Sequence, residues 1–472
     1  MRFVSYVNGL VLQFFAALMA LDAMIFHDTA GSFIVSALVV GGLGGLISLA
    51  TQSTPEGLRR AHIFLLTTSV WLSAALAGAV PLAFWSLSGP DALFEAVSGI
   101  TTTGATVMSG LDQTPRGVIF WRALLQGVGG VGFIVTGMAL LPILRIGGMQ
   151  LFRTESSDKG GKELRNAAGF ASATLKVYLG LIAVCALVYA AGGMTAFDAI
   201  THAMTTLSTG GYSGYDASFG HFQSPFLQWA CTLFMFLGAL PFAWYIRVYY
   251  RGIYRSEQIE AMLWTLSLTI LGLTLWLTMT RDMPPTEALR LVAFNVVSVV
   301  TTTGYATTDY TLWGPFAVAA FFMLTAVGGC TGSTAGGAKA MRWLLAWRAV
   351  IAQIKRIQSP NSITTIRYEG RRVEDDVING VSSFFLFYFA TFAVLSLALS
   401  LLGQDIQTAT SGALTALANV GPGVGSIIGP AGNFATLNDP EKLVLTLGML
   451  LGRLEMLTAL VLLTPVFWRE AL

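Results

Sequence analysis

Charged residues are scarce in this chain of 472 residues. Asp, Glu, Lys and Arg make up 11% of it, whereas a soluble globular domain contains roughly 25%. Hydrophobic residues make up 54%, and the mean hydropathy is +0.67. The shortage of charge excludes an ordinary soluble protein and predicts a protein embedded in a membrane.

Cysteine and histidine are also rare. The three cysteines, Cys185, Cys231 and Cys330, lie far apart in apolar segments, which excludes a disulfide framework and a metal-ligand spacing. The four histidines show no metal spacing either, and no nucleophile motif is present. We therefore expect no enzyme activity, no organic cofactor on this chain and no nucleic-acid partner.

Long polar stretches are missing as well. The largest, at about 145–167 and 352–377, have the size of loops rather than of a soluble domain. Any regulatory domain must therefore belong to another chain.

Long apolar runs, in contrast, are abundant. Ten of them reach or approach the ~20 residues that cross a bilayer. They lie at about 4–26, 31–50, 62–87, 117–144, 168–192, 225–249, 259–280, 313–349, 378–402 and 441–467. Lys and Arg gather in alternate loops, together with Arg2 and Arg469. This distribution predicts a multi-pass membrane protein with both termini in the cytoplasm.

On the external side, four runs are followed by a short segment of about ten to fourteen residues, which is too short to cross. Each short segment opens near an acidic residue, which suits the positive end of a helix dipole. These residues are Asp91, Asp198, Glu287 and Asp405. We expect four re-entrant half-helices.

Each half-helix ends in a polar tetrad that contains glycine. The tetrads are TTTG (Thr101 to Gly104), LSTG (Leu207 to Gly210), TTTG (Thr301 to Gly304) and ANVG (Ala418 to Gly421). The repeated unit predicts an all-α polytopic membrane protein with four linked span, half-helix, filter-loop, span repeats around one central pore, plus two extra N-terminal transmembrane helices. The expected segments are 1–55 for the N-terminal extension and 56–150, 151–255, 256–372 and 373–472 for pore repeats one to four.

Two interpretations of the tetrads compete. Small residues can simply help membrane helices to pack. Four such loops in register fit better with irregular backbone that lines a water-filled cavity. Half-helix C-termini and loop carbonyls around one axis favour a cation, and because no tetrad contains a carboxylate, they favour a large monovalent ion such as potassium.

The third loop, Thr302-Thr303-Gly304-Tyr305, is similar to the T-V-G-Y-G signature of potassium channels. With STGGYS at 208–213 and ANVGPG at 418–423, the chain resembles the Trk/Ktr/HKT superfamily of potassium transporters, in its bacterial TrkH-type form. The resemblance implies potassium-selective uptake, because glycine rather than serine stands in each tetrad. It also implies K⁺ as the only bound metal, a homodimer in the lipid of the bacterial inner membrane, and a cytosolic nucleotide-binding regulatory subunit of the TrkA type.

The same resemblance assigns the filter. The potassium-binding residues that it implies are Thr102, Thr103, Gly104, Ser208, Thr209, Gly210, Thr302, Thr303, Gly304, Asn419, Val420 and Gly421.

A second glycine-rich stretch, GGCTGSTAGGAKAMR, interrupts the eighth apolar run from Gly328 to Arg342. Glycine costs ~1 kcal/mol in a helix interior, so five glycines within ten residues predict a break. A packing face with small residues every four positions is the alternative.

The resemblance implies instead an intramembrane gate loop at 328–338, beneath the filter, with Arg453 of the last run against its carbonyls. The residues implied for this gate are Gly328, Gly329, Gly332, Ser333, Thr334, Gly336, Gly337 and Lys339.

Several other polar residues are interpreted as scaffold. Arg122 and Gln126 are expected to brace the first half-helix, His202 to be a hydrogen-bonded scaffold residue, and Glu95 and Asn295 to play equivalent bracing roles. The fingerprint Gly127-x-Gly129-x-x-Gly132 follows no strand, so we expect helix packing there and no dinucleotide site.

One functional rival stays open. Broken helices also occur in secondary transporters, which bind a cation or a small solute near the midplane and couple it to H⁺ or Na⁺. Saturable flux that depends on a coupling ion would identify such a symporter.

Overall fold

The computed structural model describes residues 1–52, 60–139, 167–361 and 364–471. Within these residues the fold is helical, apart from an antiparallel hairpin of β1 (Arg367–Tyr368) and β2 (Arg371–Arg372). The expected segment boundaries at 55 and 150, and nearly all of the polar stretch at 145–167, fall outside the described residues.

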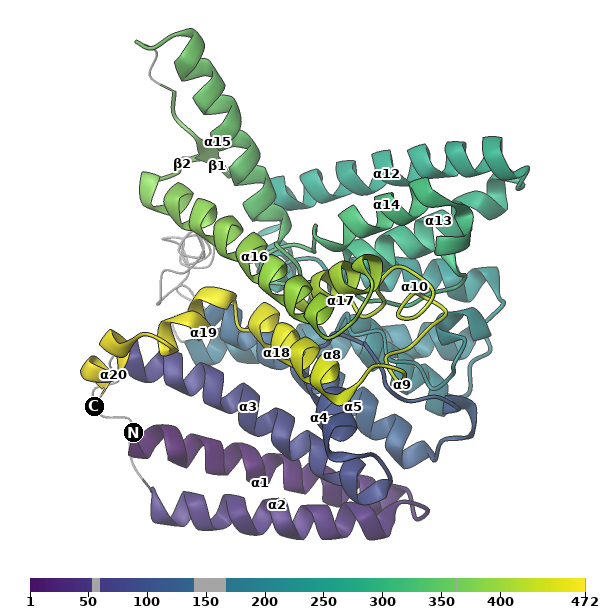
Figure 1. Ribbon diagram of the computed structural model, residues 1–472, viewed down its shortest axis with the longest axis vertical. Helices are drawn as coiled ribbons and strands as arrows, with labels where there is room; N and C mark the ends of the chain where they lie inside the picture. Colours follow the sequence, from purple (N-terminus) through teal and green to yellow (C-terminus); the bar gives the residue numbers. More distant parts are fainter. Residues whose placement is uncertain (53–59, 140–166, 362–363, 472) are drawn as a thin grey trace.

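In the described part of the chain, six helices are long and apolar enough to cross a membrane. They are α1 (Arg2–Ile25), α2 (Ala30–Ala50), α3 (Arg60–Trp85), α8 (Ala167–Ala191), α12 (Glu257–Arg281) and α16 (Asp375–Leu401). In Figure 1, α1, α2 and α3 lie side by side, and the two ends of the chain lie on the same side of the molecule. The predicted all-α, multi-pass membrane class is confirmed.

The apolar run predicted at 225–249 is not one continuous helix. It divides into α10 (Pro225–Gly238) and α11 (Phe242–Arg251), which meet at 86°. Pro241 immediately precedes α11 and lacks the backbone N–H that a continuous helix would need.

The last predicted crossing is bent as well. It divides into α18 (Asp439–Arg453) and α19 (Met456–Leu462), which meet at 108°. Between them Glu455 takes a left-handed conformation with φ of 61°, which no helix can continue through. A final helix, α20, covers Pro465–Ala471.

The eighth apolar run is broken, as its glycines predict. Helix α14 (Pro315–Thr325) ends before the glycine-rich stretch, and α15 (Ala340–Gln358) begins after it. Figure 1 shows α15 projecting away from the body of the molecule, with the β-hairpin near it.

The four predicted half-helices are present. They are α4 (Gly89–Ile100), α9 (Ala196–Leu207), α13 (Pro285–Val300) and α17 (Ile406–Ala418). The hydroxyls of Ser88 and Thr195 cap α4 and α9 by accepting hydrogen bonds from the backbone of the predicted acidic residues. Asp405 caps α17, and its hydrogen bonds from Thr408 lower the pKa of its carboxyl group.

The N-terminal helices pack against the first repeat. Asn8 of α1 donates a hydrogen bond to Ser69 of α3 at 2.8 Å. The rings of Phe15 and Phe33 contact Trp121 of α5 (Arg116–Ala139), with centroid distances of 6.4 and 5.6 Å. The extension therefore supports the helices that follow and precede the first half-helix.

Candidate ion-conduction site

The four half-helices end in the same backbone conformation. A residue at the end of each has a left-handed conformation, with φ between 52° and 58°, and a glycine two residues later also has a positive φ. The left-handed residues are Thr102, Thr209, Thr302 and Asn419, and the glycines are Gly104 (84°), Gly211 (72°), Gly304 (82°) and Gly421 (106°). Such angles are costly for threonine, so the surrounding structure must impose them.

These angles correct the predicted alignment of the second loop. Gly211, not Gly210, takes the place of Gly104, so the second tetrad is STGG at 208–211. The backbone hydrogen bonds agree, because the residue before each of these glycines donates to the carbonyl five residues back. An alignment of the sequence on glycine cannot choose between the consecutive residues Gly210 and Gly211. The left-handed Thr209 decides, because the equivalent glycine lies two residues after the left-handed residue in every loop.

The four loops contact one another in a closed ring. Each glycine lies against a carbonyl oxygen of the next loop, and a Cβ atom added there would come under 3.0 Å from that oxygen. The pairs are Gly104 with Gly210, Gly211 with Thr303, Gly304 with Val420, and Gly421 with Thr103. A side chain at any of the four positions would force two loops apart.

The ring opens onto a single cavity. Its volume is about 300 Å³, and Gly104, Gly211, Gly304 and Gly421 all line it. One cavity shared by four loops from four half-helices means that the loops surround one axis. The arrangement can offer backbone oxygens and helix C-terminal dipoles to a cation, and the four loops themselves carry no carboxylate.

A polar side chain nine residues before each of the first three glycines holds the chain beyond the loop. Glu95 bonds to Thr106, His202 to Ser213 and Asn295 to Thr307, each at 3.0 Å. His202 lies nine residues before Gly211, so it occupies the position of Glu95 and Asn295 only when Gly211, rather than Gly210, is aligned with Gly104 and Gly304. The scaffold roles predicted for these three residues are confirmed.

Arg122 and Gln126 on α5 brace different parts of the site, Arg122 the first half-helix and Gln126 the second loop. The Arg122 guanidinium pairs with Glu95 at 2.8 Å, and both side chains are at most 1% exposed, so its predicted role is confirmed. The prediction for Gln126 is wrong. Its Nε2 donates to the Gly210 carbonyl at 2.7 Å and its Oε1 accepts from the Tyr212 backbone at 3.0 Å, which holds the second loop.

Tyrosines fasten loops two and three to the repeat before them. Tyr212 donates its hydroxyl to the Glu95 carbonyl at 2.8 Å. Tyr305 shares a 2.5 Å hydrogen bond with Thr205. Each tyrosine directly follows the loop glycine, so it fixes the outer end of that loop.

Loops four and one are joined by an amide instead. Asn419 Nδ2 donates to Thr103 Oγ1 and to the Met449 carbonyl, both at 2.9 Å. The least regular tetrad therefore supplies the side chain that closes the ring.

The predicted gate loop lies against the inner ends of three half-helices. Gly336 N donates to Thr302 Oγ1 (2.7 Å), Gly337 N to the Ala418 carbonyl (2.8 Å), and Thr334 Oγ1 to the Leu207 carbonyl (3.0 Å). The other residues implied for the gate share this segment between α14 and α15. The predicted gate loop is thus in direct hydrogen-bonded contact with the predicted filter and the half-helix ends beside it.

Arg453 reaches the gate loop from α18. Its guanidinium donates to the Thr334 carbonyl at 3.0 Å and to the Gly129 carbonyl at 3.2 Å, so the predicted contact with loop carbonyls is confirmed. Glu455 points elsewhere and pairs with Arg342 at 2.5 Å.

The glycines of the fingerprint on α5 serve close packing. A Cβ atom at Gly129 would lie under 3.0 Å from the Ile100 carbonyl, and one at Gly127 would lie 3.0 Å from the terminal methyl of Met204 on α9. The helix-packing prediction is confirmed.

Sequence reasoning missed Gln258, whose Oε1 accepts from Thr331 N of the predicted gate loop at 3.0 Å. A lone glutamine at the start of α12 gives no signal in the sequence.

Comparison with known proteins gives one consistent result. The family model TrkH, described as cation transport protein, matches residues 32–468. The chain is 46% identical to the Trk system potassium uptake protein TrkI of Halomonas elongata, over 98% of this chain and 95% of that protein. It is 35% identical to the Trk system potassium uptake protein TrkH of Vibrio parahaemolyticus, over 99% of each chain.

The fold agrees with a solved structure. The crystal structure of the potassium transporter TrkH from Vibrio parahaemolyticus matches with a TM-score of 0.90 at 32% identity. The match covers 99% of this chain and 100% of that chain.

Replacing Glu95 by Gln should destabilise the protein. The change leaves the Arg122 guanidinium buried without its counter-charge, and breaking a buried pair in this way costs about 3–5 kcal/mol. We expect a lower unfolding temperature in detergent than for the native protein. The control is Glu260→Gln, because the pair of Glu260 with Arg255 is exposed; equal melting of both variants would contradict the prediction.

Proposed function

This chain belongs to the TrkH family of cation transport proteins, and from that premise we propose that it takes up potassium through a filter formed by the four glycine loops. The observation that carries the proposal is the closed ring, in which four loop glycines line one cavity. Relatives named as potassium uptake proteins support the same ion. The proposed mechanism is conduction, without covalent chemistry.

The proposed filter comprises the residues predicted from the sequence, with Gly211 added. They are Thr102, Thr103, Gly104, Ser208, Thr209, Gly210, Gly211, Thr302, Thr303, Gly304, Asn419, Val420 and Gly421. Carbonyl oxygens would replace the hydration shell of the ion, and the four negative half-helix ends would offset its charge. A ring of neutral oxygens without carboxylates suits K⁺ better than a divalent ion, which prefers charged ligands.

Beneath the filter, the loop at 328–338 would act as a gate. Arg453 and the Thr334 carbonyl form one contact there, and Lys339 Nζ bonds to the Ala335 carbonyl. Two buried cationic side chains close to the conduction path oppose the entry of K⁺ by charge repulsion. Displacement of the loop would move Lys339 and break the contact between Arg453 and the Thr334 carbonyl.

The assembly that we propose is a homodimer of four-repeat chains in the bacterial inner membrane, with both termini in the cytoplasm. A cytosolic nucleotide-binding subunit of the TrkA type would set the open fraction of the gate. The naming of the relatives as parts of a Trk system supports a multi-subunit assembly. A membrane potential supplies about 2.3 kcal/mol per charge per 100 mV, which suffices to drive inward K⁺ movement.

Serine at the loop glycines should weaken selectivity for potassium. Gly104→Ser and Gly211→Ser each place a side chain at a positive φ and against a neighbouring carbonyl, a strain of ~1–3 kcal/mol. We expect the ratio of Rb⁺ to Na⁺ flux into liposomes to fall by about tenfold. Gly210→Ser should lower the ratio as well, because the new atoms would displace the Gln126 side chain that holds the second loop.

The matched control is Gly89→Ser, since nothing lies within 4 Å of a Cβ atom at that position. Unchanged flux ratios in folded Gly104 and Gly211 variants would argue against the filter. The same liposomes, given a pH or Na⁺ gradient in place of a potential, test the symporter: flux that follows the gradient would favour the rival mechanism.

Deletion of residues 328–336 should raise the rate of Rb⁺ flux. The two ends of the segment meet, because a Cβ atom on Gly337 would lie 2.5 Å from the Gly328 Cα and 3.4 Å from the Val327 carbonyl carbon. Val327 can therefore join Gly337 without separating α14 from α15. Arg453→Gln, which keeps the loop and removes the charge, should raise flux less. Equal or lower flux in both folded variants would show that the segment only packs.

A further inference from the structure

An acidic side chain is buried at the C-terminal end of α1, far along the chain from the proposed filter and gate. Asp22 lies in the last turn of this helix and is 0% exposed. Within the described residues, neither of its carboxylate oxygens has a hydrogen-bond partner, and it forms no ion pair. A buried carboxylate without compensation is costly, so this side chain calls for a partner that the protein itself does not supply.

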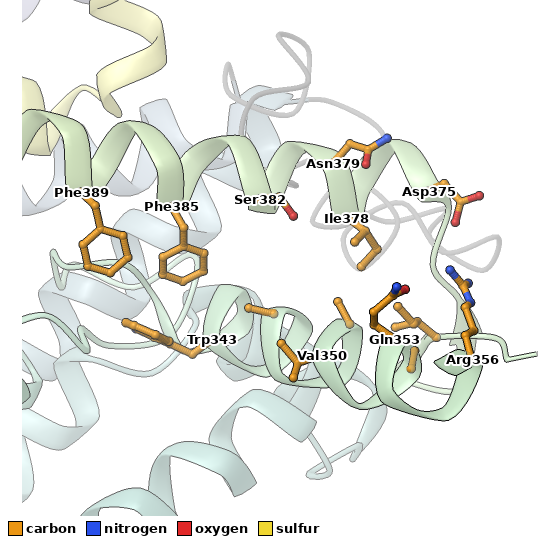
Figure 2. Close-up of a pocket in the computed structure, with 14 residues that line it drawn as sticks. Trp343, Val350, Gln353, Arg356, Asp375, Ile378, Asn379, Ser382, Phe385 and Phe389 are labelled. Atoms are coloured by element: carbon orange, nitrogen blue, oxygen red, sulfur yellow. The ribbon is translucent and has the colours of Figure 1, made fainter. Parts of the chain in front are cut away.

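Charged residues elsewhere on the chain are in a different situation. Between α15 and α16 lies a cleft of about 630 Å³, and Figure 2 shows Arg356 and Asp375 at one end of it. Both side chains are exposed on this chain, so water can solvate their charges. Asp22 has no such exposure, and its charge must be met inside the protein.

A second buried oxygen lies beside Asp22. Thr29 stands at the N-cap of α2, where a threonine hydroxyl ordinarily accepts a hydrogen bond from the helix backbone. Its hydroxyl makes no such bond, is 3% exposed and has no partner among the described residues. The threonine oxygen is therefore available to a ligand in the same way as the carboxylate.

Gly117 of α5 brings the two oxygens together. A Cβ atom added there would lie 3.0 Å from Asp22 Oδ1 and under 3.0 Å from Thr29 Oγ1. The absence of a side chain at 117 thus lets oxygens from α1 and from the start of α2 approach one point of the α5 backbone. Three helices meet at this point, and two of them contribute an unpartnered oxygen.

The surroundings of these oxygens favour a positive charge. The last turn of α1 contains no basic residue, and the negative end of its dipole adds to the charge of the carboxylate. Arg116 precedes Gly117, but its side chain is exposed and its guanidinium lies over the Phe197 ring at 5.5 Å. The Phe26 ring packs against Phe120 and Phe197, with centroid distances of 5.4 and 5.8 Å, and gives the site an apolar wall.

We propose that Asp22 and Thr29 bind one monovalent cation, Na⁺ in preference to K⁺, at the junction of α1, α2 and α5. A single carboxylate balances one positive charge, whereas a divalent ion usually takes more charged oxygen ligands. A carboxylate also has a stronger field than the neutral carbonyls of the proposed filter, and a strong field favours the smaller ion. Further ligands would come from the last carbonyls of α1, which have no partner within the helix.

This ion would be additional to the K⁺ expected at the filter, and its role would be to fasten the N-terminal extension. It would join α1 and α2 to α5, the helix whose Arg122 and Gln126 brace the first half-helix and the second loop. The expected effect is therefore on the stability of the protein.

Thermal unfolding of the full-length protein in detergent tests the site. Every sample contains the same concentration of K⁺, and Na⁺ is compared with choline at equal ionic strength. We expect Na⁺ to raise the unfolding temperature by about 2 °C or more, because a ligand that binds only the folded state stabilises it. Direct binding of radioactive Na⁺ under the same conditions should approach one ion per chain.

Two variants test the two ligands. Asp22→Asn should lose the effect of Na⁺ and should unfold no lower than the native protein in choline, since it removes an uncompensated buried charge. Thr29→Val keeps the carboxylate and the shape of the side chain, and should bind Na⁺ about tenfold more weakly. Asp28→Asn is the matched control, because Asp28 is exposed in the same turn, and it should respond as the native protein does.

Two results would overturn the proposal. Equal unfolding of the native protein in Na⁺ and in choline, without bound Na⁺, would show that Asp22 is buried as a neutral acid. A full response to Na⁺ in both Asp22→Asn and Thr29→Val would place the ion elsewhere. Neither measurement uses potassium flux, so failure here leaves the proposed filter unaffected.

Discussion

The contact between each loop glycine and the carbonyl oxygen of the next loop is the constraint on which the rest of the structure depends. Irregular backbone at membrane depth is tolerated only where protein or water satisfies it. The contact leaves no room for a Cβ atom, which requires glycine at 104, 211, 304 and 421. Because the contacts close into a ring, no loop can move without displacing its neighbours. The half-helices, braces and tyrosines all act to hold this ring.

The repeats meet this constraint with different side chains. At equivalent positions the first uses a buried carboxylate paired with Arg122, the second His202 and the third Asn295. The fourth has glycine at the equivalent position, and its neighbour Ser411 bonds to the Val424 carbonyl at 3.0 Å. The fourfold arrangement is therefore complete in the backbone and only approximate in the side chains. The backbone keeps the fourfold symmetry in the loops that form the ring. The side chains that hold those loops lose it, because a carboxylate, an imidazole or an amide can each make the required hydrogen bond.

The number and kind of helices could largely be predicted, because apolar segment length, acidic residues and glycines determine where helices begin and end. Short apolar segments with acidic starts predicted the half-helices, and clustered glycines predicted the break before α15. The second loop was misaligned because Gly210 and Gly211 are adjacent, and only the backbone angle of Thr209 identifies the equivalent glycine. The bend at Glu455 was missed because an apolar run gives no sign of a single left-handed residue. The partner of Gln126 was missed because it lies in another repeat, and helical spacing cannot show it.

The four-loop ring, which is the proposed filter, and the proposed gate loop form one hydrogen-bonded body. The Thr302 hydroxyl, on a strained residue of the filter, accepts from the backbone of Gly336 in the loop. The Arg342–Glu455 pair joins the start of α15 to the bend between α18 and α19, next to Arg453. Separating a buried ion pair is costly, since each charge would remain buried alone. A displacement of α15 is therefore expected to carry that bend with it, and Arg453 and the loop carbonyls would move as one unit. In this arrangement a force applied to α15 reaches the inner end of the proposed filter through the hydrogen bonds from Gly336 and Gly337.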